Sequence, residues 1–274
     1  MQGTAWWMST LAACSVVLLA TAIGPLLIRG SAATIAKRLP WALTLAIGVL
    51  LGDAFLHLLP HAWIDLGANA TVLLAVCGFG LFASLGVLMR GAGDRSRRQM
   101  APLSLWGDGL HNMGDGALIA LAFATSPLLG IATVVAILAH ELPQELGDYA
   151  MLLESGITPF RAVLLNLASG GTVFIGAFAG LLLGSAAEDY LSWLEPVAAG
   201  GFLYLALFVL LPTVRRKWRG SVSNGAWRFA PAILGVAAMA SLALAEKQLG
   251  VDHGHVHAIE EHAPTKNFAP WTPR

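Results

Sequence analysis

Apolar residues along this chain fall into eight long runs that are separated by short polar breaks. Each run is about 20 residues long, which is the length an α-helix needs to cross roughly 30 Å of hydrocarbon. The breaks consist mostly of turn formers and charged residues, as in Arg29-Gly30-Ser31 and Ser126-Pro127. The pattern therefore predicts eight transmembrane helices, over residues 5–28, 40–63, 70–89, 104–125, 129–154, 159–184, 190–214 and 227–248.

The composition supports a membrane protein. Hydrophobic residues make up 57% of the 274 residues, and charged residues make up 12%, about half the share found in soluble domains. We expect an all-α polytopic membrane protein, with a single transmembrane domain over residues 1–250 and a His-containing extracytoplasmic tail over residues 251–274. The formal net charge is zero and no basic patch appears, so the expected partner is the lipid bilayer and not a nucleic acid.

The basic residues predict the orientation, because Lys and Arg accumulate on the cytoplasmic side of a membrane. With the N-terminus outside, all 16 Lys and Arg residues except Lys247, Lys266 and Arg274 fall in or beside inner breaks. Eight helices with both termini outside satisfy this distribution. Because no outer domain is apparent in a chain of this length, we expect a prokaryotic inner membrane.

Several expected helices carry polar side chains at mid-membrane, where ionisable groups are costly and typically mark an ion path. Asp115 lies ten residues past Leu105, which at ~1.5 Å per residue places it ~15 Å deep, near the midplane. Residues four apart share one face of a helix, so two neighbouring helices can direct such groups toward one point. The residues concerned on the helices over 104–125 and 129–154 are His111, Asn112, Asp115, His140, Glu141 and Gln144.

Imidazole, carboxylate and amide groups together are typical ligands of a divalent transition metal. Zinc is the leading candidate, with cadmium, iron(II) and manganese as alternatives, and the motifs contain no cysteine thiolate that would favour copper(I). Carboxylates would also neutralise a cation that has lost its water. The alternative for any single residue is a hydrogen-bonded position in the helix core. We predict a transported metal ion and no organic cofactor.

Four further residues are predicted to line the ion path. Asp53 and His57 lie four apart on the helix over 40–63, nearer its outer end, and His61 continues the same series. Helix packing by Asp53 and an interfacial position of His61 are the alternatives. Glu145 and Asp148 lie toward the inner end of the helix over 129–154. Each of them could line the ion path or form a salt bridge with an arginine of an inner break.

Two motifs among these residues resemble the ZIP (Zrt-, Irt-like protein) family of zinc and iron transporters. The segment H-N-M-G-D-G from His111 resembles the family's H-N-x-x-[DE]-G, and H-E-L-P-Q-E-L-G-D from His140 resembles the H-E-x-P-H-E-x-G-D of its largest animal subfamily. Residues 52–60 and 199–212 agree with the family as well. The chain departs from it at Gln144, where the subfamily has His, and in Ser169–Phe174, which lacks the carboxylate of some bacterial members.

The resemblance implies eight helices with both termini outside and a metal site between the helices over 104–125 and 129–154. It implies influx toward the cytoplasm by a homodimer, in which a transport bundle moves against a scaffold. Matched residue by residue, Asn112 and Glu141 take the positions of an adjacent second site. The main site is taken by His111, Asp115, His140 and Gln144.

An enzyme is the first competing hypothesis, although we expect none. His140-Glu141-Leu142-Pro143-Gln144 is one residue away from H-E-x-x-H, in which two His bind zinc and Glu is the general base of a metalloprotease. The missing second His, the helix-disturbing Pro143 and the otherwise unexplained pair His111 and Asp115 argue against an intramembrane protease.

A metal sensor that transports nothing is the second competing hypothesis. It would depend on the tail, which carries His253, His255 and His257. In a transporter the same tail could capture metal as an accessory, although His-rich segments are loose compositional signals.

Overall fold

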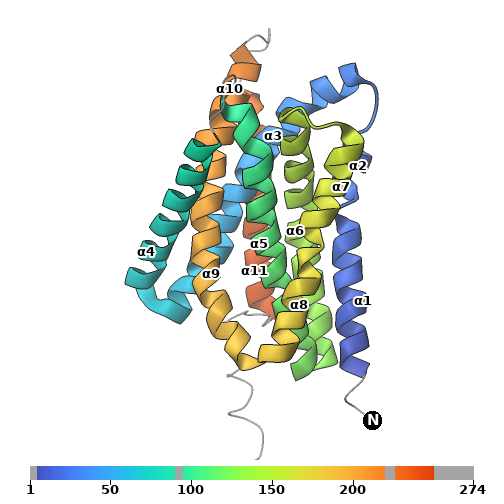
Figure 1. Ribbon diagram of the computed structural model, residues 1–274, viewed down its shortest axis with the longest axis vertical. Coiled ribbons are helices and arrows are strands. Elements are labelled where there is room, and N and C mark those ends of the chain that lie inside the picture. Colours follow the sequence, from blue (N-terminus) through green and yellow to red (C-terminus); the bar gives the residue numbers. More distant parts are fainter. Residues whose placement is uncertain (1–4, 90–94, 220–225, 250–274) are drawn as a thin grey trace, which may run out of the picture.

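The computed structural model describes residues 5–89, 95–219 and 226–249, and every regular element within them is helical (Figure 1). The all-α class is thereby confirmed. The tail, with His253, His255 and His257, lies outside the described residues. The elements are α1 (Ala5–Ala20), α2 (Ile23–Leu27), α3 (Ala32–Asp53), η1 (Ala54–Leu58), α4 (Leu59–Leu88), α5 (Arg95–Thr125), α6 (Pro127–Glu154), α7 (Pro159–Gly170), α8 (Thr172–Leu183), α9 (Ser185–Tyr204), η2 (Leu205–Leu210), α10 (Leu211–Arg219), η3 (Ala226–Phe229) and α11 (Ala230–Leu249).

Helices cover all eight of the apolar runs, but several ends differ from expectation. Helix α3 begins at Ala32, eight residues before the expected start at 40, and continues through Pro40. The break between the helices expected over 70–89 and 104–125 is shorter than predicted, because α5 already begins at Arg95 and continues through Pro102. The break near Asp65 is a reversal within a continuous helical stretch, at Gly67 with φ 75° and ψ 165°. This left-handed backbone favours glycine, which has no Cβ to clash with the adjacent carbonyl.

Two prolines explain two π-helical turns. The turn η1 ends two residues before Pro60, and the turn η2 ends two residues before Pro212. A proline inside a helix has no N–H for the carbonyl four residues earlier and its ring clashes with that carbonyl, so a wider turn relieves the conflict. The turn η1 contains His57, so this local distortion sets the direction of a candidate path residue.

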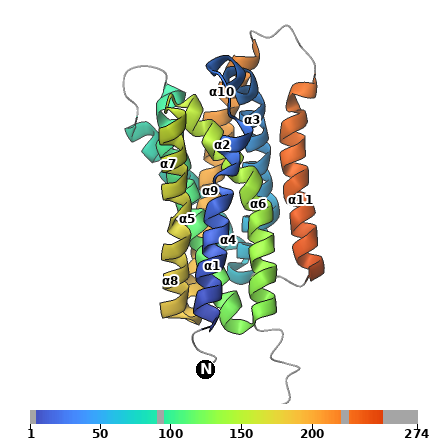
Figure 2. The same ribbon diagram turned by 90° about the vertical axis from the view of Figure 1, so that its right-hand side faces the viewer.

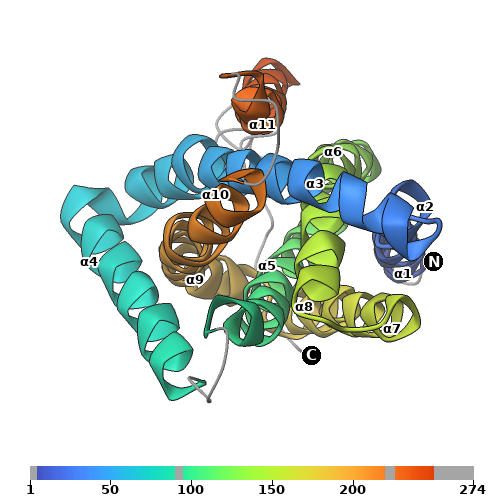
Figure 3. The ribbon, with the colours of Figure 1, turned by 90° about the horizontal axis from the view of Figure 1, so that it is seen from above.

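Helix α5 lies inside the bundle and packs against α1, α6, α7, α8 and α9, whereas α11 stands at the periphery beside α3 (Figures 2 and 3). Glycines allow α5 and α8 to approach closely. A Cβ on Gly116 would lie 1.8 Å from the carbonyl oxygen of Val173, and one on Gly176 would lie 1.7 Å from that of Met113. The two backbones therefore touch where α5 carries its polar motif.

The surface of the bundle is apolar, and its interior holds buried polar side chains beside a hydrophobic core. Leu88, Leu128 and Phe160 are 81%, 80% and 73% exposed, whereas Asp53, Asn112 and Glu141 are fully buried. Such a large exposed apolar surface would be unfavourable in water and suits contact with lipid. Among the described residues, six helical stretches are long and apolar enough to span a membrane, namely Trp6–Leu27, Ala32–Leu88, Pro127–Glu154, Pro159–Leu183, Ser192–Trp218 and Ala226–Ala245.

Basic side chains gather at one end of the bundle, which we call the basic end. It is the end of α2, α10 and the α6–α7 turn, at the top of Figure 1, and α1 begins at the opposite end. The described basic residues near it include Arg29, Lys37, Arg38, Arg161, Arg215, Arg216, Lys217 and Arg228.

Candidate metal centre

The middle portions of α5 and α6 face each other and carry the polar residues of both motifs. Pro143 lies inside α6 without ending it. Helical spacing places His111 and Asp115 on one face of α5, and His140 and Glu141 face them from α6. All six residues predicted as ligands are at most 6% exposed: His111, Asn112, Asp115, His140, Glu141 and Gln144.

Four of these side chains converge on one point. The Nε2 atom of His140 lies 3.2 Å from both His111 Nε2 and Asp115 Oδ2. His111 Nε2 lies 3.8 Å from Asp115 Oδ2 and 3.7 Å from Glu141 Oε1. One ligand atom from each residue lies within 4.8 Å of every other. Tetrahedral zinc, with bonds of about 2.0–2.2 Å, needs ligand atoms about 3.3–3.6 Å apart, so these four side chains suit a zinc ion.

Asn112 and Gln144 do not join the four converging side chains and make other contacts. The Asn112 amide donates to Asp108 Oδ1 at 2.9 Å and to the Asp108 carbonyl oxygen at 3.2 Å. Gln144 borders Ala46 and Leu50 of α3, and neither of its amide atoms has a hydrogen-bond partner within the described residues. No hydrogen bond therefore joins Gln144 to the four converging side chains.

A second acidic group adjoins the first on the side of the basic end. Ligand atoms of Asp108, Glu141 and Glu145 lie within 4.8 Å of one another, so Glu141 belongs to both groups. Glu145 Oε2 accepts a hydrogen bond from the Asn166 amide of α7. Asp148, farther along α6, accepts a 2.5 Å hydrogen bond from Ser104 of α5.

Imidazole rings form a row that leads away from the basic end. The ring centroids of His111 and His140 are 5.2 Å apart, those of His140 and His57 are 5.2 Å apart, and those of His57 and His61 are 4.8 Å apart. Asp53 Oδ1 lies 3.4 Å from His57 Nδ1. The turn η1 thus places the predicted path residue His57 beside the predicted ligand His140, and Asp53 at the end of α3 contacts His57.

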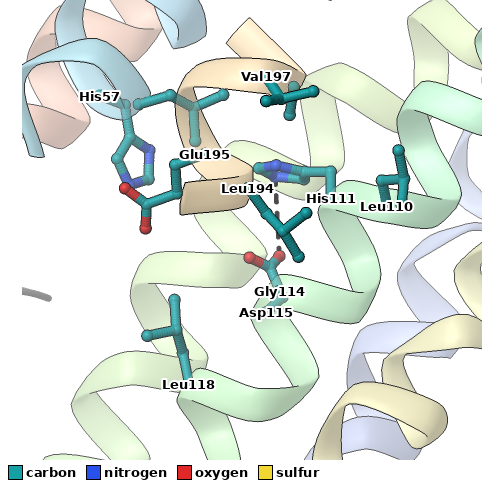
Figure 4. Close-up of a pocket in the computed structure, with 11 residues that line it drawn as sticks. His57, Leu110, His111, Gly114, Asp115, Leu118, Leu194, Glu195 and Val197 are labelled. Carbon is teal, nitrogen blue, oxygen red and sulfur yellow. Dashed lines mark ion pairs between the residues drawn. The ribbon is translucent and has the colours of Figure 1, made fainter. Parts of the chain in front are cut away.

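Two acidic residues near the centre were not predicted from the sequence, Asp108 and Glu195. Asp108 precedes His111 by three and Asn112 by four residues, so helical spacing could have placed it on the same face. Glu195 comes from α9 and lines a cavity together with His57, His111 and Asp115 (Figure 4). In the sequence, Glu195 is the single acidic residue within the apolar run 190–214. Its position could have marked it as a candidate, because a carboxylate is costly there.

Comparison with known proteins agrees with the chemistry of this centre. A family model described as "ZIP Zinc transporter" matches residues 90–243, which include α5 to α10. The zinc transporter ZIP4 of Rattus norvegicus is 45% identical over 130 residues, which are 45% of this chain and 20% of the rat protein.

Two further relatives are less similar to this chain. The human zinc transporter ZIP10 is 42% identical over 113 residues, covering 41% of this chain and 14% of that protein. The Drosophila melanogaster zinc transporter foi is 36% identical over 166 residues, covering 58% of this chain and 23% of the fly protein. The aligned segments therefore span less than a quarter of the length of these relatives.

Proposed function

The chain belongs to the ZIP zinc transporter family, and from this premise we propose that it carries zinc across a membrane through the centre between α5 and α6. The observation that supports this most strongly is the convergence of His111, Asp115, His140 and Glu141, whose ligand atoms lie within 4.8 Å of one another. Two imidazoles and two carboxylates suit zinc. The carboxylates offset the cost of holding a dehydrated dication away from water.

Glu141 is the residue shared by the two groups, so we propose that it passes the ion between them. The four converging side chains form the first position, and Asp108, Glu141 and Glu145 form the second. This differs from the sequence-based prediction, in which Gln144 belongs to the main site and Asn112 to the second. A role for Asn112 and Gln144 as ligands stays a prediction.

Polar side chains continue from the centre toward both ends of the bundle, which supports a continuous path. His57 and His61 lead away from the basic end. Asp108, Glu145 and then Asp148 lead toward it, and Asp148 lies eight residues beyond His140 along α6, about 12 Å at 1.5 Å per residue. We propose that zinc enters by way of the histidines and leaves along these carboxylates.

The orientation is part of this proposal. The stretch Ala32–Leu88 reverses at Gly67 and therefore crosses twice, and α5 crosses as well although its motif lowers its hydropathy. The basic end faces the cytoplasm by the distribution of Lys and Arg, which places both termini outside and makes the flux inward. A single transmembrane domain over 1–250 and a homodimer remain predictions. A prokaryotic inner membrane finds no support in the relatives described above, which are animal proteins.

Neither competing hypothesis is favoured by the comparisons. The family and its relatives are described as transporters, so we do not propose a protease. The sensor hypothesis depends on the tail, which lies outside the described residues. Cadmium, iron(II) and manganese remain candidate substrates beside zinc, because the same ligands accept them.

Zinc influx into proteoliposomes that contain a zinc-sensitive dye tests the proposed function. We expect wild-type protein to transport zinc, and His111→Ala and His140→Ala each to reduce the flux about tenfold or more, because even supporting groups of metal sites have effects of that size. Cys77→Ala is the control, since Cys77 is exposed and far in sequence from both motifs. Wild-type flux in both histidine variants would refute the site, and absence of flux in folded wild-type protein would refute the function.

A further inference from the structure

A small cavity lies beside the proposed zinc position, between η1, α5 and α9 (Figure 4). Its volume is about 40 Å³, enough for a few water molecules and far below the roughly 300 Å³ of a site for an organic ligand. Its polar wall consists of His57, His111, Asp115 and Glu195. The apolar remainder includes Leu58, Leu110, Leu118, Leu194 and Val197.

Glu195 brings a carboxylate into this cavity from the middle of α9. Its Oε2 atom is shielded from solvent and has no hydrogen-bond partner within the described residues. In Figure 4 the carboxylate points toward the imidazole of His57. A carboxylate oxygen without a hydrogen bond in a cavity lined largely by apolar side chains is costly, and a cation in the cavity would offset this cost.

The cavity lies on the side of the proposed zinc position that faces away from the basic end. Asp115 and Leu118 follow His111 along α5 toward Thr125, the end of α5 opposite the basic end. The row of imidazoles from His61 through His57 reaches the zinc position from the same side. A cation that enters along this row therefore encounters His57 and Glu195 before it reaches His111.

We propose that Glu195, together with His57, holds a partly hydrated divalent transition-metal cation in this cavity, one step before the centre between α5 and α6. This inference rests on the proposed function. The cavity volume allows the ion to keep some of its water, whereas four protein ligands replace that water at the next position. Glu195 thus favours entry of the cation and gives up the ion before it crosses the centre.

The kinetic consequence is an effect on KM without a matching effect on kcat. In zinc influx assays we expect Glu195→Gln to raise KM about tenfold, by analogy with the effect of groups that support a metal site, while kcat changes little. Glu195→Asp, which keeps the charge, should restore most of the lost affinity. A change that was only structural would not be rescued by charge alone.

Asp65→Asn is the matched control. Asp65 is exposed on α4, accepts a 2.7 Å hydrogen bond from Ser192 of α9 and does not line the cavity. We expect the KM of Asp65→Asn for zinc to equal that of the wild type. An unchanged KM in Glu195→Gln would overturn the proposal, and so would an equal rise in Asp65→Asn, because the effect would then be one of surface charge.

Equilibrium binding tests the cavity independently of transport. In detergent, calorimetry with cadmium as the probe should still find a weak site in the double variant His111→Ala, His140→Ala. Adding Glu195→Gln should remove that site, and the difference between the two proteins excludes cadmium bound elsewhere on the chain. Equal cadmium binding by the double and triple variants would refute the cavity site.

The two proposals can fail separately. If wild-type protein transports no zinc but the Glu195-dependent cadmium site is present, the cavity site stands and the transport function fails. If zinc is transported with an unchanged KM in Glu195→Gln and no Glu195-dependent cadmium site is found, the function stands and this inference fails.

Discussion

At the scale of single residues, Glu141 is the most informative side chain. It is fully buried, its Oε1 lies 3.7 Å from His111 Nε2, and neither carboxylate oxygen has a hydrogen-bond partner within the described residues. A buried charge without such partners destabilises a protein. Binding of zinc at the proposed centre would remove this cost, so we expect Glu141 to link the stability of the protein to zinc binding.

We therefore expect Glu141→Gln to leave the zinc-free protein as stable as the wild type or more stable, and to abolish its stabilisation by zinc. Zinc at 100 times its Kd should stabilise wild-type protein by roughly 2.7 kcal/mol. Thermal unfolding in detergent with and without zinc measures both effects. Glu154→Gln is the control, because Glu154 is also buried on α6 but pairs with Lys217 at 2.7 Å near the basic end. A full zinc response in Glu141→Gln would contradict the shared role.

At the scale of elements, the approach of α5 to α8 supports the centre. Both glycines at this contact lie close to the motif residues, since Gly116 follows Asp115 and Gly176 faces the carbonyl of Met113. Any side chain here would push α8 away from α5, because the nearest atoms are backbone atoms that cannot rotate aside. Helix packing thereby holds the positions of His111 and Asp115 relative to α6.

Gly176→Ala is expected to destabilise the protein by about 1–3 kcal/mol, the usual cost of overpacking, and to lower zinc affinity. Gly80→Ala is the matched control. A Cβ on Gly80 of α4 would meet no atom within 4 Å, so the same substitution should be neutral or slightly stabilising. Melting temperatures and zinc binding of the two variants provide the comparison, and equal behaviour would show that the α5–α8 contact tolerates expansion.

At the scale of the whole molecule, the bundle combines an apolar exterior with a polar interior that extends toward both ends. The direction of the proposed transport depends on which end faces the cytoplasm. Turns at the two ends can be distinguished by labelling, since Thr125 ends α5 away from the basic end and Thr158 precedes α7 at the basic end. Both threonines are exposed.

In a chain whose Cys14 and Cys77 are replaced by alanine, we expect Thr125→Cys to react with a membrane-impermeant thiol reagent added outside intact cells. Thr158→Cys should react only after the cells are opened. The opposite pattern would reverse the orientation and therefore the direction of flux. Reaction of both residues in intact cells would show that these turns do not lie on different sides of a membrane.

The amino-acid sequence by itself determined the helical class, the course of the apolar runs and the two helices that carry the predicted metal ligands. These follow from local properties: apolar length, turn residues at breaks, and helical spacing of His111 with Asp115. Only the tertiary structure decided which side chains meet, namely that Asn112 contacts Asp108, that Glu141 is shared by two groups and that Glu195 reaches the cavity from α9. The physical reason is that helix rotation and separation depend on close packing between elements, such as Gly116 against α8, and on distortions such as η1. Spacing along one helix does not encode either of them.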